Sequence, residues 1–137
     1  PGDEAASPEG IAMRMQEAAA FFLVREEDGK VVGFVNGTLS TSEALTHDSM
    51  GTHEPSGTTL CVHSVVTRED RRRKGMGTST LKAYIEYIKS QQSSVQWIAL
   101  ICKQNLTSFY AGCGFEMKGP SPVVHGTDQW FEMRLRC

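Results

Sequence analysis

Apolar residues near the N-terminus recur at the spacing of an α-helix. The segment Ser7-Pro8-Glu9 marks its start, because a capping residue followed by proline is a common beginning of a helix. The apolar positions that follow are Ile11, Met15, Ala18 and Phe22. Their spacing predicts a helix whose apolar side faces the core.

The next part of the chain is β-like. Residues 21–26 and 30–39 are two apolar runs, and Glu27-Asp28-Gly29 between them is typical of a tight turn. These features predict a β-hairpin. Residues 58–67 and 95–102 are further apolar runs, and each predicts a buried strand.

Helical spacing returns twice in the second half of the chain. Residues 105–112 predict a short helix that Asn105 caps and that Gly112 and Gly114 end. The alternating run 129–137 predicts a last strand. The resulting order of elements predicts an α/β domain built around a mixed sheet. A longer helix before residues 95–102 is predicted by one apolar stripe, made of Leu81, Tyr84, Ile85 and Ile88.

Composition limits the function classes. The chain has 137 residues, 39% of them hydrophobic and 22% charged, which is typical of one globular domain. A formal net charge of -2 and a pI near 6.1 argue against nucleic-acid binding. No apolar run approaches the length of a membrane span and no signal peptide is recognisable, so we expect a cytoplasmic protein that binds neither membrane nor nucleic acid. The four cysteines show no CxxC pair, and we expect reduced thiols.

A long polar stretch occupies residues 40–57, and loops of this length tend to be functional. His47-Asp48 and His53-Glu54 within it could be taken for metal ligands. Their offset fits no compact ligand motif, so we expect no metal. A better use for this loop is to form a wall of a binding pocket, with carboxylates that would tolerate a cationic ligand.

Four cations and two glycines stand together in RRRKGMG, residues 71–77. The run lies between a predicted strand and a predicted helix, where the helix N-terminus is already positive. A bound anion would remove this conflict, and Gly75 and Gly77 would let backbone N–H groups approach phosphate oxygens. A solvated charged surface is the alternative.

These residues resemble the GNAT superfamily of N-acetyltransferases. The stretch VVTREDRRRKGMGTSTLKAYI is similar to the central strand–loop–helix motif of that superfamily, and NLTSFYAGCGF is similar to its second motif. The matching positions are Arg72, Gly75, Gly77, Asn105, Tyr110, Gly114 and Phe115.

The resemblance implies a fold and a cosubstrate. The fold is a mixed, mostly antiparallel, twisted sheet, splayed at its centre, with flanking helices. The family's first strand and first helix have no counterpart here, so residues 1–137 would be a single, N-terminally shortened acetyltransferase domain. The cosubstrate is acetyl-CoA, with its pyrophosphate in the basic loop and its pantetheine arm along the splayed strand. The implied contacts are Val65, Val66, Thr67, Arg72, Arg73, Lys74, Gly75, Met76, Gly77, Thr78, Asn105 and Ser108.

The resemblance can be narrowed to one branch of the superfamily. ALTHDSMGTHEPSG, followed by a strand with His63, resembles the serotonin (arylalkylamine) N-acetyltransferase branch and its fungal polyamine-acetylating relatives. The serotonin enzymes carry two histidines on that strand, and here the first position is Cys61. Only one of the two imidazoles of that relay is therefore present.

The chemistry of amine acetylation assigns further roles. An alkylamine has a pKa of about 10, so a base must remove its proton, and His63 is the best candidate, with an expected apparent pKa of about 6 to 7.5. The resemblance makes Tyr110 the acid for the departing thiolate, and a backbone N–H near Val65 would meet the oxyanion. The structural alternatives are a hydrogen-bonded strand histidine and a packed aromatic. Cys61 as a nucleophile is disfavoured, because nothing in the sequence activates it.

The sequence therefore predicts an N-acetyltransferase that uses a ternary complex, with an arylalkylamine or a polyamine as acceptor. A protein or peptide N-acetyltransferase and a non-catalytic acyl-CoA-binding regulator are the alternatives. We expect a monomer or a weak dimer.

Overall fold

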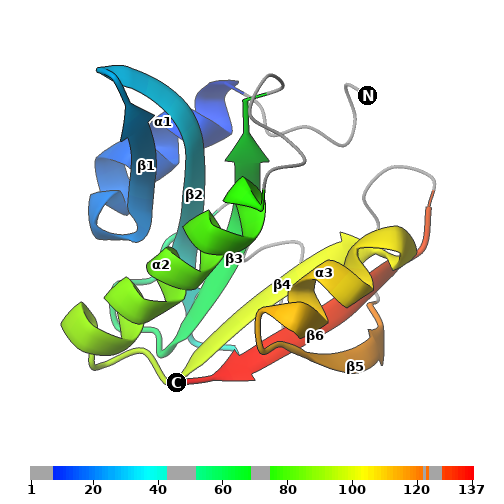
Figure 1. Ribbon diagram of the computed structural model, residues 1–137. Helices are drawn as coiled ribbons and strands as arrows, with labels where there is room; N and C mark the ends of the chain where they lie inside the picture. The colour runs from blue at the N-terminus through cyan, green and yellow to red at the C-terminus, as the bar shows by residue number, and fades with distance from the viewer. Residues whose placement is uncertain (1–7, 43–51, 69–74, 122, 124–127) are drawn as a thin grey trace.

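A six-stranded mixed sheet with helices on both faces forms the centre of the molecule (Figure 1). The computed structural model describes residues 8–42, 52–68, 75–121, 123 and 128–137. Over these residues the elements are α1 (Pro8–Glu17), a 3-10 helix (Ala19–Phe21), β1 (Phe22–Glu27), β2 (Lys30–Ser40), β3 (Thr59–Thr67), α2 (Met76–Gln91), β4 (Trp97–Lys103), a second 3-10 helix (Gln104–Leu106), α3 (Thr107–Gly112), β5 (Glu116–Pro120) and β6 (Trp130–Arg136).

The sheet has the strand order β1-β2-β3-β4-β6-β5. Neighbouring strands are antiparallel except β3 and β4, which are parallel. This parallel ladder holds only from the pair Thr59↔Trp97 to the pair Cys61↔Ala99, after which the two strands diverge (Figure 1). The mixed, mostly antiparallel sheet that is splayed at its centre is thus confirmed.

The β1–β2 hairpin has the predicted turn. Asp28 and Gly29 have φ angles of 53° and 77°. Two consecutive residues with positive φ match the twist of the flanking strands, and Asp-Gly is a sequence that tolerates this geometry. The turn therefore fixes the pair Glu27↔Lys30, and a bulge between Arg25 and Glu26 then shifts the register to the one that places Phe22 opposite Asn36.

The main core lies between the sheet and helix α2. The predicted stripe is confirmed, because Leu81, Tyr84, Ile85 and Ile88 are all buried. They pack against one face of the central strands, whose apolar residues alternate with residues of the other face. In Figure 1 α2 lies in front of β2 and β3 and α1 lies behind β1 and β2, so the two helices cover opposite faces.

The predicted apolar stripe of the first helix is wrong. Helix α1 ends at Glu17, and a 3-10 turn then redirects the chain, so that Phe21 rather than Phe22 enters the main core. Met15 is 56% exposed, whereas Arg14 is only 6% exposed. Helix α1 therefore presents an arginine, not an apolar stripe, to the sheet.

The cap predicted for the short helix is also wrong. A 3-10 turn over Gln104–Leu106 precedes α3, and no side chain caps the helix. Asn105 is exposed, and Thr107 Oγ1 donates to the carbonyl of Gln104 at 2.8 Å instead. The end of α3 at Gly112 is as predicted, and Gly114 follows with a φ of 102°.

The edge strand β5 was not singled out in the sequence. It pairs with β6, but all of its residues except Gly119 are exposed. The apolar alternation that identifies a half-buried strand is therefore missing from it.

Two tyrosines of α2 offer a test of the packing between α2 and the turn before β1. The hydroxyl of Tyr84 donates to the carbonyl of Phe21 at 2.8 Å in a buried environment, and that of Tyr87 donates to the carbonyl of Ala20 at 3.0 Å in an exposed one. Removing a buried donor leaves its acceptor without a partner, so Tyr84→Phe should lower the free energy of unfolding by about 1 to 2 kcal/mol. Tyr87→Phe, the control, should cost clearly less in urea denaturation. Equal losses would show that burial does not set the strength of these bonds.

Candidate active site

The candidate site lies where β3 and β4 separate. From Val62 to Thr67, β3 pairs with β2 on one side only, because its ladder with β4 ends at Cys61. The backbone N–H and C=O groups on the open side therefore need partners other than β4. An extended ligand that enters the split could supply them, as an added strand would.

A β-bulge places His63 next to this split. On β2 the residues Asn36 and Gly37 are consecutive, but their partners on β3 are Ser64 and Val62. His63 is thus the extra residue of β3 and has no partner in the ladder. Bulges re-aim side chains and recur beside active sites.

The imidazole of His63 is held at one nitrogen only. Its Nε2 lies 2.7 Å from Oγ1 of Thr38. Its Nδ1 is buried and has no hydrogen-bond partner among the described residues. One ring nitrogen is therefore free to exchange a proton with a small ligand.

The environment of His63 keeps the imidazole neutral. Burial, and after it the positive charge of Arg14, lower the pKa of His63 to about 3. This value lies below the apparent pKa of about 6 to 7.5 expected from the sequence, which refers to the base at work in the reaction. Arg14 was not predicted from the sequence, because an arginine inside a helical run usually faces water. Burial lowers the pKa of Arg14 as well.

Tyr110 is packed on the other side of the split, on the helix that follows β4. Its ring meets Phe109 edge-on at 5.0 Å and Phe115 at 5.8 Å between centroids. Burial raises the pKa of Tyr110, and the neighbouring Cys102 and Cys113 raise it further. The phenol thus stays protonated at neutral pH, so in a proton transfer it could give a proton but not take one. No hydrogen bond joins Tyr110 and His63 in the described part of the chain.

The first turn of α2 faces the mouth of the split. A Cβ on Gly77 would lie 3.6 Å from the ring of Phe109 and 3.7 Å from Oγ1 of Thr67, so the ends of β3, α2 and α3 meet here. Gly75 precedes the helix with a φ of 70°, and no side chain caps the helix. An uncapped helix N-terminus offers backbone N–H groups to an anion. The predicted phosphate contacts fit this position.

The other predicted contact residues are distributed unevenly. Arg72, Arg73 and Lys74 lie outside the described residues. Val65 packs against the main core, whereas Val66 is 38% exposed. The remaining positions are a buried Met76, a half-buried Thr78, and exposed Asn105 and Ser108 at the start of α3.

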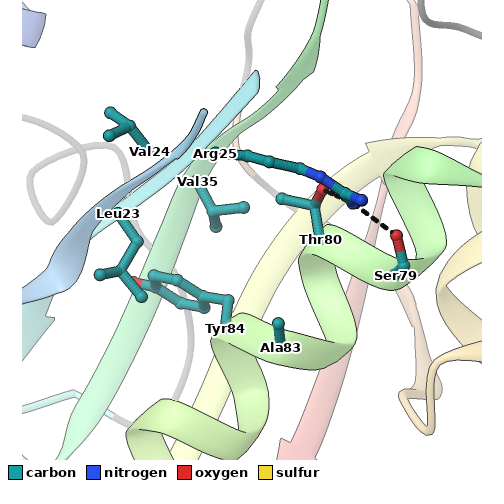
Figure 2. Close-up of a pocket in the computed structure, with 8 residues that line it drawn as sticks. All are labelled: Leu23, Val24, Arg25, Val35, Ser79, Thr80, Ala83 and Tyr84. Atoms are coloured by element: carbon teal, nitrogen blue, oxygen red, sulfur yellow. Dashed lines mark hydrogen bonds between the residues drawn. The ribbon is translucent and has the colours of Figure 1, made fainter. Parts of the chain in front are cut away.

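Arg25 is a contact that the sequence did not reveal. From the edge strand β1 its Nη1 donates to Oγ of Ser79 at 2.6 Å and to Oγ1 of Thr80 at 3.0 Å (Figure 2). It lies 3.5 Å from the carbonyl of Met76. Arg25 thus fixes the first turns of α2 to the hairpin, at one end of a pocket that Leu23, Val24, Val35, Ala83 and Tyr84 also line.

Two residues of the long loop hold its end to β2. The backbone N–H of Leu39 donates to Nδ1 of His53 at 3.0 Å, and Thr41 donates to the carboxylate of Glu54 through its N–H and its hydroxyl. His47 and Asp48 lie outside the described residues. The described residues contain no group of three His, Cys, Asp or Glu side chains suited to a metal ion. None of the helices described is long and apolar enough to cross a bilayer.

Comparison with known proteins gives one family. The profile of the acetyltransferase (GNAT) family matches residues 2–115. The chain is 34% identical, over 113 residues, to a serotonin N-acetyltransferase from Mesocricetus auratus, an alignment that covers 81% of this chain and 54% of that protein. The chain spans about half the length of the curated relatives that it matches.

Two solved structures share the fold at low sequence identity. One is the loading GNATL domain of CurA from Lyngbya majuscula, with a TM-score of 0.85, 14% identity, and coverage of 98% of this chain and 85% of that one. The other is the GphF GNAT-like decarboxylase in complex with isobutyryl-CoA, with a TM-score of 0.80, 14% identity, and coverage of 99% and 88%.

The lowered pKa of His63 predicts a dependence of stability on pH. Between about pH 3 and pH 6.5 His63 is protonated in the unfolded chain but neutral in the folded protein. The free energy of unfolding therefore rises with pH across this window. The stability associated with the neutral imidazole is fully present above about pH 6.5 and is lost as the pH falls. His63→Gln should flatten this slope, measured by urea denaturation at several pH values.

His53→Gln is the control for this experiment. Burial lowers the pKa of His53 too, but the charge of Glu17 opposes the shift. Its substitution should change the slope less than that of His63. A slope that His63→Gln leaves unaltered would contradict a neutral, buried imidazole.

Proposed function

Because this chain belongs to the acetyltransferase (GNAT) family, we propose that it transfers the acetyl group of acetyl-CoA to the primary amine of an arylalkylamine or a polyamine. The observation that carries this proposal is the open split between β3 and β4, with the uncapped N-terminus of α2 at its mouth. The first feature suits an extended arm and the second suits phosphates.

The residues around the split would hold the cosubstrate. Acetyl-CoA supplies an acetyl group activated as a thioester. Backbone N–H groups of residues 75–78, with Arg72, Arg73 and Lys74, would bind its pyrophosphate. The open edge of β3 at residues 65–67 would bond the pantetheine arm. Asn105, in the 3-10 turn before α3, and Ser108, in α3, would contact the cosubstrate.

His63 would take part in removing the proton from the acceptor. An alkylammonium has a pKa of about 10, so at neutral pH the acceptor enters protonated and cannot attack. An imidazole whose pKa is about 3 cannot keep that proton, but it can pass it to solvent. We therefore assign His63 to a relay through water, with Cys61 in the place of a second imidazole.

The bond changes define the role of Tyr110. The lone pair of the amine forms a bond to the thioester carbon, and the C–S bond breaks with its electron pair going to sulfur. The hydroxyl of Tyr110 would give the sulfur a proton and regain one as the attached nitrogen loses its second proton. The proton removed from the ammonium before attack is then the one that leaves to solvent in each turnover. A backbone N–H near Val65 would stabilise the charged carbonyl oxygen by about 3 kcal/mol.

The test is release of CoA thiol from acetyl-CoA by the purified protein with arylalkylamines, polyamines and peptides. We expect turnover with the small amines. Turnover with peptides alone would favour a peptide acetyltransferase. Binding of acetyl-CoA in calorimetry without turnover on any amine would favour a non-catalytic acyl-CoA-binding regulator.

Gly77 gives a prediction specific to the cosubstrate. A methyl group fits beside Phe109 and Thr67 in the protein alone, but it would occupy the mouth of the split. Gly77→Ala should leave the fold intact and raise the KM for acetyl-CoA about tenfold or more, with a smaller effect on the KM for the amine. Gly112→Ala is the matched control, because a Cβ there meets no atom within 4 Å. Equal KM values for acetyl-CoA in the two variants would place the cosubstrate elsewhere.

Tyr110→Phe tests the acid. The variant keeps the edge-on ring contacts with Phe109 and Phe115 and loses only the proton donor. We expect kcat to fall about ten- to a thousandfold while calorimetry shows nearly unchanged binding of acetyl-CoA. Tyr87→Phe, which removes an exposed hydroxyl that bonds Ala20, should have full turnover. If Tyr110→Phe does too, Tyr110 only packs.

A further inference from the structure

Asn36 has a side chain whose polar atoms are buried without partners. Its exposed fraction is 0%. Neither Oδ1 nor Nδ2 has a hydrogen-bond partner among the described residues. Buried amides are satisfied in most proteins, so each exception calls for an explanation.

The side chain points to the same face of the sheet as the imidazole of His63. Val35 belongs to the core under α2, and residues alternate along a strand, so Asn36 and Thr38 point to the opposite face. Thr38 Oγ1 contacts Nε2 of His63 on that face. Across the ladder, Asn36 is paired with Ser64, the residue that follows His63. Directly paired residues have Cβ atoms about 5 Å apart, so the carboxamide lies beside the bulge.

Two neighbouring polar groups thus lack protein partners on one face. They are the carboxamide of Asn36 and Nδ1 of His63, and these polar atoms are buried. A buried water satisfies such groups when it has two or more polar partners. A carboxamide both donates and accepts, which suits a water that must hand on a proton.

We propose that Asn36 is a positioning residue for this reaction: its carboxamide and Nδ1 of His63 together bind a water that carries the proton of the acceptor to the imidazole. The inference rests on the proposed function. The water accepts one proton from the ammonium nitrogen as it gives one of its own to Nδ1, so its composition is unchanged. The nitrogen of the acceptor keeps the electron pair and becomes a neutral amine, ready to attack the thioester.

The arrangement explains an otherwise unfavourable side chain. Asn36 is surrounded by the buried positions of β2, where an apolar residue of the same shape would need no hydrogen bond. Replacing an unsatisfied buried amide with such a residue is neutral or stabilising. A purely structural role of Asn36 would therefore predict a loss of stability in Asn36→Leu. A role in proton transfer predicts a loss of kcat with stability kept.

The experiment compares two acceptors of different basicity in the wild type and in Asn36→Leu. One is an alkylamine, which is protonated at the assay pH, and the other is a fluorinated alkylamine, which is mostly neutral there. For the alkylamine we expect kcat of the variant to fall about ten- to a hundredfold, with both KM values within about threefold. For the fluorinated amine kcat should stay within about twofold, because no proton has to be removed before the attack. The thermal unfolding midpoint should be equal to or above that of the wild type.

A matched pair keeps the test valid if leucine does not fit. The side chains of threonine and valine have the same shape, but only threonine can bond the water. The variant Asn36→Thr should therefore retain several times the kcat of Asn36→Val with the alkylamine. Equal losses with both acceptors, or equal kcat in the two variants, would overturn the proposal. So would a raised KM for the alkylamine at unchanged kcat, which would mean that Asn36 binds the amine itself. A wild-type protein that turns over neither amine would overturn the proposed function, and this inference with it.

Discussion

The structure depends on the early end of one strand pairing, the parallel ladder between β3 and β4. That ladder stops at Cys61 and Ala99, and beyond it β3 is bound on one side only. The split leaves backbone groups of β3 that need partners other than β4. At its mouth the first turn of α2 lies near α3, with Gly77 close to Phe109. A continuous sheet would be better hydrogen-bonded, but it would have no opening for an extended ligand. The apolar stripe of α2 and the six-stranded sheet together hold this gap open.

Charge controls what can happen beside the gap. Arg14 and His63 lie on the face under α1, and the guanidinium reinforces burial in keeping the imidazole neutral. Tyr110, on the opposite side, is kept protonated by its burial among apolar rings. In the proposed reaction the neutral imidazole would accept a proton and the phenol would give one. The surroundings of each group reinforce the state that its ordinary pKa already favours at neutral pH.

Strongly periodic segments were predictable from sequence, and segments redirected by tertiary contacts were not. The stripe of α2 and the Asp28-Gly29 turn are local patterns, and both hold in the structure. The face of α1 failed because a 3-10 turn resets the chain direction before Phe22, which no local pattern announces. The candidate site divides in the same way. Motif spacing located His63 and Tyr110, but the bulge at His63, the buried Arg14 and the bridge from Arg25 to α2 are contacts between distant segments.

The two faces of the sheet differ in the side chains that they bury. The face under α2 and α3 is filled with apolar side chains, whose burial supplies most of the folding free energy. The face under α1 instead holds Thr38, His63 and Asn36, which gain little stability from burial and lose some where they lack partners. A domain of this size tolerates such a loss only because the other face is well packed. Substitutions under α2 should therefore alter stability first, whereas apolar substitutions under α1 should alter chemistry before stability. Separating the two effects is possible here because the same strands, β2 and β3, contribute alternate residues to both faces.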